Sequence, residues 1–425
     1  MIRTDLDRLI ATWLDEDAGA GAPDYLDETL AGIGHLRQRP AWASPGRWLP
    51  VQMTLPRVVI PRAIPAILVT GLLILALVAA AVFVGSRRHV PAPFGLAATG
   101  LLAYDSNGDI LVAQADGSGT RPVITGPAQE FGATWSRDGS RLAYWSGSTA
   151  AASLWTADAD GSNPRQLTAQ TFGVEPLGPA ADWSPGGDKL AFATTDGRLY
   201  VIGADGTDLR RLGDDRLQRG LPGWSPDGTL IAFRAAVQGE PENWGGYVVR
   251  PDGTDEQQIS PPKGDTETTH ILMNWTHDSR ALIYHTGTAG QLSIAESRRG
   301  ADGRWHERVL VPADPRNLDI LPMLSNDGGR LAFIRAVSGA GTSAEVNRVM
   351  IANVDGSDIH ELSTQRVALL PLCWTPDDRS IRAVADTPGS ADRTIVVIPL
   401  DGAPVVTIPA ASSVSAACPL QRLAP

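Results

Sequence analysis

The sequence predicts an all-β protein built around a seven-bladed β-propeller, with six blades as the alternative. A short helical segment and one transmembrane helix are predicted to precede it. Three observations lead to this prediction: an uncharged apolar run at 63–85, an aromatic-led turn that recurs six times after it, and an Asp-Gly pair that recurs seven times. Short apolar strands that repeat with a period of roughly 40 to 50 residues are typical of propeller blades.

Composition limits the classes of function. The chain has 425 residues with 36 Lys and Arg against 47 Asp and Glu, which gives a net charge of -11. This acidic balance argues against a nucleic-acid surface, which needs clustered positive charge. Two cysteines exclude a disulfide scaffold and a cysteine-rich zinc module. Because no P-loop, GxGxxG or GxSxG motif is present, we expect no cofactor, no metal site and no catalytic residue.

Residues 1–62 are expected to form a cytoplasmic segment with two short amphipathic helices, the second starting near Asp24. The first helix carries an apolar stripe with helical spacing, and short helices of this kind are marginal in water unless they pack against something. The stripe can pack against the second helix, lie on the inner leaflet or bind a cytoplasmic protein. Its residues are Leu6, Leu9, Ile10, Trp13 and Leu14.

Residues 63–85 are predicted to be a transmembrane helix. Twenty-three uncharged residues at about 1.5 Å each cover roughly 34 Å, enough for a hydrocarbon core of about 30 Å. Five arginines lie between positions 37 and 62, and only Arg87 and Arg88 follow closely. The excess of positive charge before the span places the N-terminus in the cytoplasm. Residues 86–100 then form a linker, and residues 101–425 are expected outside the membrane of a bacterial cell.

The aromatic-led turn defines one strand-turn-strand unit per repeat. It reads WSRDGSRLAY at 135–144, WSPGGDKLAF at 183–192 and WSPDGTLIAF at 224–233, with weaker copies at 275–284, 324–333 and 374–383. Because the first residue of the turn recurs at one structural position, we expect it to pack between blades, with ligand stacking as the alternative. These residues are Trp135, Trp183, Trp224, Trp275, Leu324 and Trp374.

The Asp-Gly pair marks a second hairpin in each repeat, because its tight turn needs the positive φ that glycine supplies. Each repeat therefore has four strands. Seven Asp-Gly pairs against six aromatic turns imply that the first repeat, at 101–125, lacks one strand. We expect the tail at 413–419 to supply it and to close the ring.

The repeated SPDG turn, an apolar strand and a DG hairpin resemble the TolB-like, WD-repeat-like propeller family over roughly residues 101–410. The copies depart from the pattern at Gly186, His277, Ser279, Asn326 and Asp378 within the turns, and at Leu324, which stands in place of tryptophan. The resemblance implies a propeller that serves mostly as a binding platform, and it implies little about chemistry.

Three groups of residues are candidate sites: the repeated aspartates, three histidines and the two cysteines. The repeated aspartates are explained by turn chemistry, because Asp bonds its own backbone in such turns. His270, His277 and His285 fall in one repeat without a ligand pattern and are expected to be solvated loop residues. Cys373 and Cys418 occupy equivalent offsets in neighbouring first strands and are a candidate disulfide, with two unrelated buried thiols as the alternative.

The expected function is non-catalytic binding of a protein or an envelope component through loops at one mouth of the propeller. One alternative is a transducer whose cytoplasmic helices hold a regulator, because the layout resembles that of transmembrane anti-sigma factors. The zinc-binding pattern of many such factors is absent, since residues 1–62 contain no cysteine. A hydrolase or lyase with a site at the propeller mouth is the third alternative.

Overall fold

The computed structural model divides the chain into two units, Met1–Ser86 and Arg87–Pro425. The structure describes residues 98–174, 181–240, 244–260, 273–288, 291–337, 346–370, 372–386, 393–408 and 420–423, all in the second unit. The predicted helices at 1–62, the apolar stripe and the predicted membrane span at 63–85 lie outside these residues. Within the described ranges, no helix is long and apolar enough to cross a membrane.

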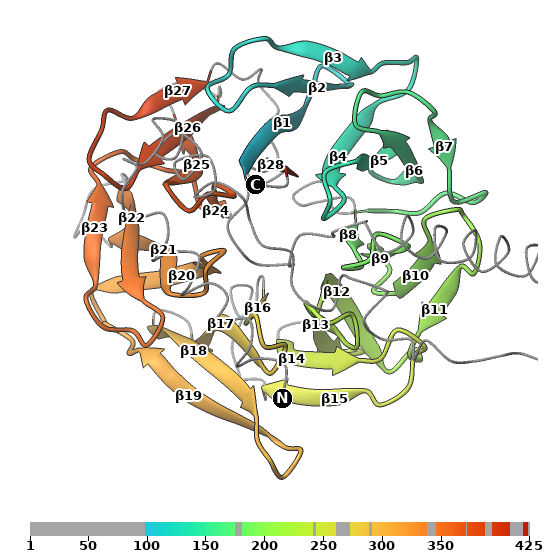
Figure 1. The fold of residues 1–425 in the computed structure, drawn as a ribbon. Helices are drawn as coiled ribbons and strands as arrows, with labels where there is room; N and C mark the ends of the chain where they lie inside the picture. The colour runs from blue at the N-terminus through green and yellow to red at the C-terminus, as the bar shows by residue number, and fades with distance from the viewer. Residues whose placement is uncertain are drawn as a thin grey trace, which may run out of the picture. The chain divides into compact units, whose positions relative to one another are not determined.

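Seven four-stranded antiparallel sheets are arranged in a ring, each with one strand at the centre and one at the rim (Figure 1). The prediction of a seven-bladed, all-β propeller is therefore confirmed, and the six-bladed alternative is wrong. Strands are written below from the innermost to the outermost strand of each blade.

Blades 1 to 4 cover the first half of the ring. Blade 1 contains β28 (Leu420–Leu423), β1 (Ala98–Ser106), β2 (Asp109–Ala113) and β3 (Arg121–Ile124). Blade 2 contains β4 (Glu130–Trp135), β5 (Arg141–Ser148), β6 (Ala151–Asp158) and β7 (Arg165–Gln166). Blade 3 contains β8 (Asp182–Trp183), β9 (Lys189–Ala193), β10 (Leu199–Gly203) and β11 (Arg210–Leu212). Blade 4 contains β12 (Leu217–Trp224), β13 (Ile231–Val237), β14 (Trp244–Val249) and β15 (Gln257–Ser260).

Blades 5 to 7 complete the ring. Blade 5 contains β16 (Asn274–Trp275), β17 (Ala281–Thr288), β18 (Gln291–Arg299) and β19 (Trp305–Val311). Blade 6 contains β20 (Asn317–Leu324), β21 (Arg330–Val337), β22 (Val346–Asn353) and β23 (His360–Ser363). Blade 7 contains β24 (Cys373–Trp374), β25 (Ser380–Asp386), β26 (Arg393–Pro399) and β27 (Val406–Ile408).

The C-terminal tail closes the ring, but through a later segment than expected. The closing strand is β28 at 420–423, whereas the predicted segment 413–419 lies outside the described residues. β28 pairs antiparallel with β1, with Ala98 opposite Leu423 and Leu102 opposite Leu420. The ladder begins just after Pro419, and proline has no N–H to donate to a sheet. β1 also starts at Ala98, inside the segment that was expected to be linker.

The two faces of the ring differ in the connections they carry. The aromatic-led turns join the first and second strands, and the Asp-Gly turns join the third and fourth. Strands in each sheet alternate in direction, so both kinds of turn lie on one face, which we call the turn face. The other connections lie on the opposite face, which we call the loop face. In the Asp-Gly turns glycine adopts positive φ, as at Gly206 (φ 79°).

Among the described residues, the hydrophobic core consists of seven separate clusters, one at each junction between neighbouring blades. At the junction of blades 3 and 4, for example, Leu199 and Val201 pack against Trp224, Phe233 and Ala235. A strand of each blade presents apolar residues to both of its neighbours, so its two faces are both buried. Each blade therefore depends on the next one for the burial of its apolar side chains.

Candidate functional site

A pocket opens on the loop face at the junction of blades 3 and 4, and we call it the mouth pocket. Its volume is about 200 Å³. It lies between the β9–β10 hairpin of blade 3 and the first half of β12, with the start of β14 at its edge. The residues that define it here are Trp145, Asp182, Phe192, Thr195, Gln218, Leu221, Arg234 and Trp244. A concave site with apolar walls and a few polar groups is the usual form of a ligand pocket.

Aromatic rings form the walls of the mouth pocket. Trp145 and Phe192 are buried and meet edge to face, with ring centroids 5.4 Å apart. Trp244 is only partly exposed, and the Arg234 guanidinium lies over its ring at 4.4 Å from the centroid. A guanidinium at this distance is attracted by the negative face of the ring. The pocket thus combines fixed apolar surfaces with two cationic side chains, Arg234 and Arg219.

Leu221 brings backbone strain to the pocket. It has φ 50°, a left-handed conformation that is rare for a bulky side chain. It lies at a β-bulge in β12, where the pairing with β13 shifts between Gly220 and Gly223. The same bulge recurs at Gly132 in β4 and Leu321 in β20, so it belongs to the architecture of alternate blades. Bulges redirect side chains, and here the bulge places Leu221 in the pocket lining.

Asp182 supplies the one carboxylate among the described residues that line the pocket. Burial raises the pKa of its carboxyl. The charge of Arg137 and hydrogen bonds from two backbone N–H groups act in the opposite direction and lower the pKa, but burial outweighs them. One of these is the Trp224 N–H, which donates to Asp182 Oδ2 at 2.6 Å across the blade junction. The carboxyl therefore holds the two inner strands together at the base of the pocket.

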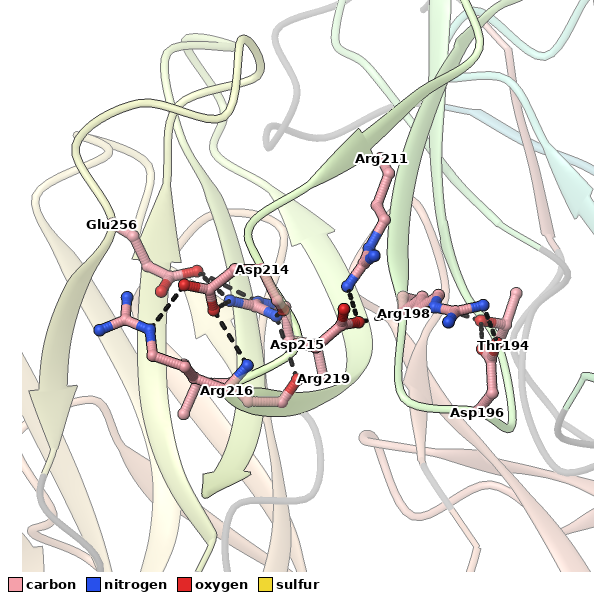
Figure 2. A network of polar contacts seen from close by, with 10 residues as sticks. Thr194, Asp196, Arg198, Arg211, Asp214, Asp215, Arg216, Arg219 and Glu256 are labelled. Atoms are coloured by element: carbon pink, nitrogen blue, oxygen red, sulfur yellow. Dashed lines mark hydrogen bonds and ion pairs between the residues drawn. The ribbon is translucent and has the colours of Figure 1, made fainter. Parts of the chain in front are cut away.

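A network of ion pairs stabilises the connection between β11 and β12, which leads into the pocket-lining residues Gln218 and Arg219 (Figure 2). The buried Arg219 side chain donates to Glu256 Oε2 at 2.9 Å and to the Asp214 carbonyl at 2.6 Å. Arg216 Nε donates to Asp214 Oδ2 at 2.6 Å. Arg219 is therefore held on β12 while it binds both the connection and the outer part of blade 4.

A second part of the network lies on blade 3 (Figure 2). Asp215 accepts a hydrogen bond from Arg211, and its carboxylate lies 3.9 Å from Arg198 Nε. Arg198 Nη1 in turn donates to Asp196 Oδ2 at 2.7 Å, in the β9–β10 hairpin. These exposed pairs contribute little stability individually. Together they connect the β9–β10 hairpin with the β11–β12 connection.

The residues predicted to pack between blades are all buried. Their exposed fractions range from 1% for Trp183 to 8% for Leu324. Three of the indole N–H groups donate to a carbonyl of the preceding blade: Trp183 to Thr134, Trp275 to Gly223 and Trp374 to Met323, at 3.4, 3.0 and 3.0 Å. None of the six lines the mouth pocket. Trp135 and Trp224 are the remaining two tryptophans of the set, at 7% and 3% exposure.

Cys373 is buried in β24 and is disulfide-bonded. Cys418 lies outside the described residues, so the pairing of the two cysteines stays a prediction. The expectation that the histidines are solvated loop residues is wrong for His285, which is 1% exposed in β17. Its Nδ1 accepts a hydrogen bond from the Leu321 N–H at 3.3 Å across the junction of blades 5 and 6. His277 is exposed in its turn, and His270 is not described.

Several residues of the mouth pocket were not predicted from the sequence as site residues. Asp182, Arg219 and Trp244 occur in no recognisable motif, because their proximity depends on how blades 3 and 4 meet. The one available signal was that Asp182 directly precedes a repeated tryptophan. Within the described ranges, no group of three or more His, Cys, Asp or Glu residues is arranged to hold a metal ion.

Comparison with known proteins identifies the class of propeller. Residues 105–310 match the TolB beta propeller domain family. The chain therefore carries a TolB-like β-propeller, as its repeated turns predicted. A comparison with curated proteins finds no match.

Solved structures share the fold at low identity. Oligogalacturonate lyase from Vibrio parahaemolyticus is 14% identical, with a TM-score of 0.52 over 71% of this chain and 86% of that chain. Prolyl oligopeptidase B from Galerina marginata is 12% identical, with a TM-score of 0.53 over 75% of this chain and 51% of that chain. TolB from Acinetobacter baumannii is 16% identical, with a TM-score of 0.47 over 73% of this chain and 79% of that chain. At these identities the likeness to the lyase and to the oligopeptidase shows the fold alone.

Proposed function

We propose that the protein is a membrane-anchored, extracytoplasmic β-propeller that binds a protein or an envelope component without catalysis. The mouth pocket is the observation that carries the proposal. Its described lining offers aromatic rings, two arginines that lie over rings, one carboxyl and several hydrogen-bonding groups, and it includes no histidine, cysteine or serine. Such a lining suits binding, and TolB-like propellers mostly serve as binding platforms.

Site-specific photo-crosslinking in intact cells tests the binding site. A photoreactive amino acid at Thr195, an exposed residue of the pocket lining, is expected to give a discrete adduct. The same group at Val309, which is 54% exposed on the outer strand β19, serves as the control. Trp244→Ala should weaken the Thr195 adduct. An equal adduct from both positions, or none from Thr195, would contradict the proposal.

The membrane anchor is proposed from the uncharged run at 63–85 and the arginines that precede it. The full chain is expected to sediment with membranes and to require detergent for release. A reporter fused after Pro425 that works only in the cytoplasm should be inactive. Recovery of the chain in the soluble fraction, or an active reporter, would refute the anchor or its orientation.

Signal transduction is the second candidate, because the stripe of Leu6, Leu9, Ile10, Trp13 and Leu14 needs a surface to pack against. Crosslinking from Leu9 and from Thr195 in the same cells separates the candidates. A cytoplasmic adduct from Leu9 that changes when the Thr195 adduct forms favours a transducer. A hydrolase or lyase with a site at the propeller mouth is the third candidate, since two structures of this fold are a lyase and an oligopeptidase. Turnover of model substrates by the purified protein would support it.

A further inference from the structure

A second cavity lies at the same junction of blades 3 and 4, but on the turn face. Its volume is about 320 Å³. It is bordered by the start of β9, the Asp-Gly turns of blades 3 and 4 and the aromatic-led turn of blade 4. Three cationic side chains line it, together with one hydroxyl and two carboxylates: Lys189, Arg210, Arg250, Thr229, Asp208 and Asp252. We call it the turn-face cavity.

In two other blades a cation at the position of Lys189 fills the space between blades. Arg141 begins β5, lies over the Trp183 ring at 4.8 Å from its centroid, and donates to the Gly187 carbonyl of blade 3. Arg330 begins β21, lies over the Trp374 ring at 5.2 Å and donates to the Asp378 carbonyl of blade 7 at 3.4 Å. Both arginines thus dock on the tryptophan and the turn of the next blade.

Lys189 begins β9 at the equivalent place but does not dock in this way. Among the described residues, no hydrogen bond, ion pair or ring contact to the next blade involves its ammonium group, and its side chain lines the turn-face cavity instead. It is one of only two lysines in the sequence. The junction of blades 3 and 4 therefore has an open cationic cavity where the junctions after blades 2 and 6 have a stacked arginine.

The lining of the cavity carries three cations and two carboxylates. Arg210 makes only a long hydrogen bond to the Asp252 carbonyl, at 3.4 Å, and Arg250 lies 3.5 Å from Asp255. The Asp252 carboxylate already accepts from the Thr254 N–H at 2.9 Å and from Thr254 Oγ1 at 2.6 Å, and these bonds lower its pKa. Asp208 is the other carboxylate of the lining. Three cations thus face two carboxylates in the lining. Asp255, outside the lining, pairs with Arg250, whereas Lys189 and Arg210 make no ion pair among the described residues.

We propose that the turn-face cavity binds an oxyanion of the phosphoryl class. Lysine and arginine side chains are the usual donors to phosphate oxygens, and their bonds to an ionised acceptor are shorter and stronger than those between neutral groups. The volume corresponds to roughly ten water molecules, so the cavity admits a phosphoryl group together with part of the group that carries it. Free phosphate and the headgroup of an anionic lipid share this chemistry. The site is independent of the mouth pocket, which lies on the opposite face.

Calorimetric titration of the full chain in neutral detergent, at low ionic strength, tests the proposal. Inorganic phosphate is expected to bind saturably at one site. Lys189→Met, which keeps the aliphatic stem, should weaken phosphate binding about tenfold, as expected for the loss of one charge-assisted hydrogen bond. Arg304→Met is the matched control. Arg304 lies in the Asp-Gly turn of blade 5, so this substitution removes one positive charge from the same face of the propeller. It should change the Kd less than twofold.

A parallel titration with glycerophosphoglycerol, a lipid headgroup without its chains, distinguishes the two sources of the ligand. Tighter binding of the diester assigns the site to a lipid headgroup, and tighter binding of phosphate assigns it to a free anion. Either result supports an oxyanion site if Lys189→Met weakens the binding of the probe. The proposal is overturned if neither probe binds, or if the Lys189 and Arg304 variants lose affinity equally, which would indicate diffuse electrostatic attraction.

Discussion

At the residue scale, two residues that depart from the repeated turn sequence form hydrogen bonds between blades. Ser279 and Asp378 stand where other copies have glycine, and both keep the positive φ of that position, 57° and 54°. Ser279 Oγ accepts from the Asp227 N–H at 3.0 Å. The Asp378 carboxylate accepts from the backbone N–H groups of Asn326 and Asp327 at 2.8 and 2.7 Å. These hydrogen bonds offset the left-handed backbone, which costs roughly 1–2 kcal/mol for a residue other than glycine.

Replacement of Asp378 by glycine tests this balance. Asp378→Gly suits the backbone better but leaves two partly buried N–H groups without their acceptor, so it should lower the free energy of unfolding by about 1–3 kcal/mol. Chemical denaturation measures the change. Asp358→Gly is the matched control, because Asp358 also has positive φ (55°) while its side chain is 74% exposed. The control should be neutral or slightly stabilising, and an equal loss in both variants would contradict the argument.

The pH dependence of stability should report Asp278. Burial by itself would raise the pKa of this carboxyl, but hydrogen bonds from Thr276 and Arg298 outweigh it and lower the pKa from 3.8 to about 2. A carboxyl whose pKa is lower in the folded state than in the unfolded state stabilises the protein at pH values above the unfolded-state pKa. This stabilisation is lost as the pH falls toward the folded-state pKa. Asp278→Asn should therefore melt below the wild type at pH 7, and the gap should close between pH 4 and pH 2. A gap independent of pH would count against these bonds.

The repeated tryptophans should be costly to truncate. Trp224 is 3% exposed and packs at the junction of blades 3 and 4. Trp224→Ala should cost about 3–5 kcal/mol, as expected for a buried aromatic ring. Trp244→Ala removes the same ring from the partly exposed rim of the mouth pocket and should cost less. Thermal unfolding of both variants compares them, and an unchanged melting temperature for Trp224→Ala would refute its core role.

At the element scale, the ring is closed by a single short strand. β28 pairs with β1 through Ala98, Thr99 and Leu102, and blade 1 has no other inner strand. Deletion of residues 420–425 removes this ladder and exposes the edge of β1 to the channel. At about 0.5–1.5 kcal/mol for each net hydrogen bond, the loss should be roughly 2–4 kcal/mol. Denaturant titration should show it, whereas deletion of residues 424–425 alone, which spares β28, should have little effect.

Element boundaries show where the sequence pattern was informative. The aromatic-led turns located the inner hairpin of blades 2 to 7 and the Asp-Gly pairs located the outer hairpin of all seven blades, because both rest on local backbone requirements. Closure by 420–423 instead of 413–419 was missed, since a four-residue strand carries no periodic signal and its pairing with β1 is a contact across the whole propeller. Arg382 was missed for a similar reason. It stands where four other blades have alanine, is fully buried, and donates to the Ala115 carbonyl of blade 1 at 2.6 Å.

At the scale of the whole molecule, a disulfide would join the last blade to the closing segment. Cys373 is disulfide-bonded in β24, and Cys418 precedes the closing strand β28 by two residues. A bridge between them should contribute about 2–4 kcal/mol by restricting the unfolded chain. Titration of thiols in the denatured, unreduced protein should find none. Two reactive thiols would exclude the bridge.

The sequence by itself determined the number of blades, the hairpins within them and the turn residues, because these depend on local backbone conformation repeated along the chain. It also determined which large side chains recur at one position. Only the tertiary structure decided what lies at the junction of blades 3 and 4, where Asp182, Leu221 and Trp244 meet at one face and Lys189, Arg210 and Arg250 at the other. A propeller buries its apolar side chains between blades, so the cavities at those junctions depend on pairs of residues from different repeats that no local pattern connects.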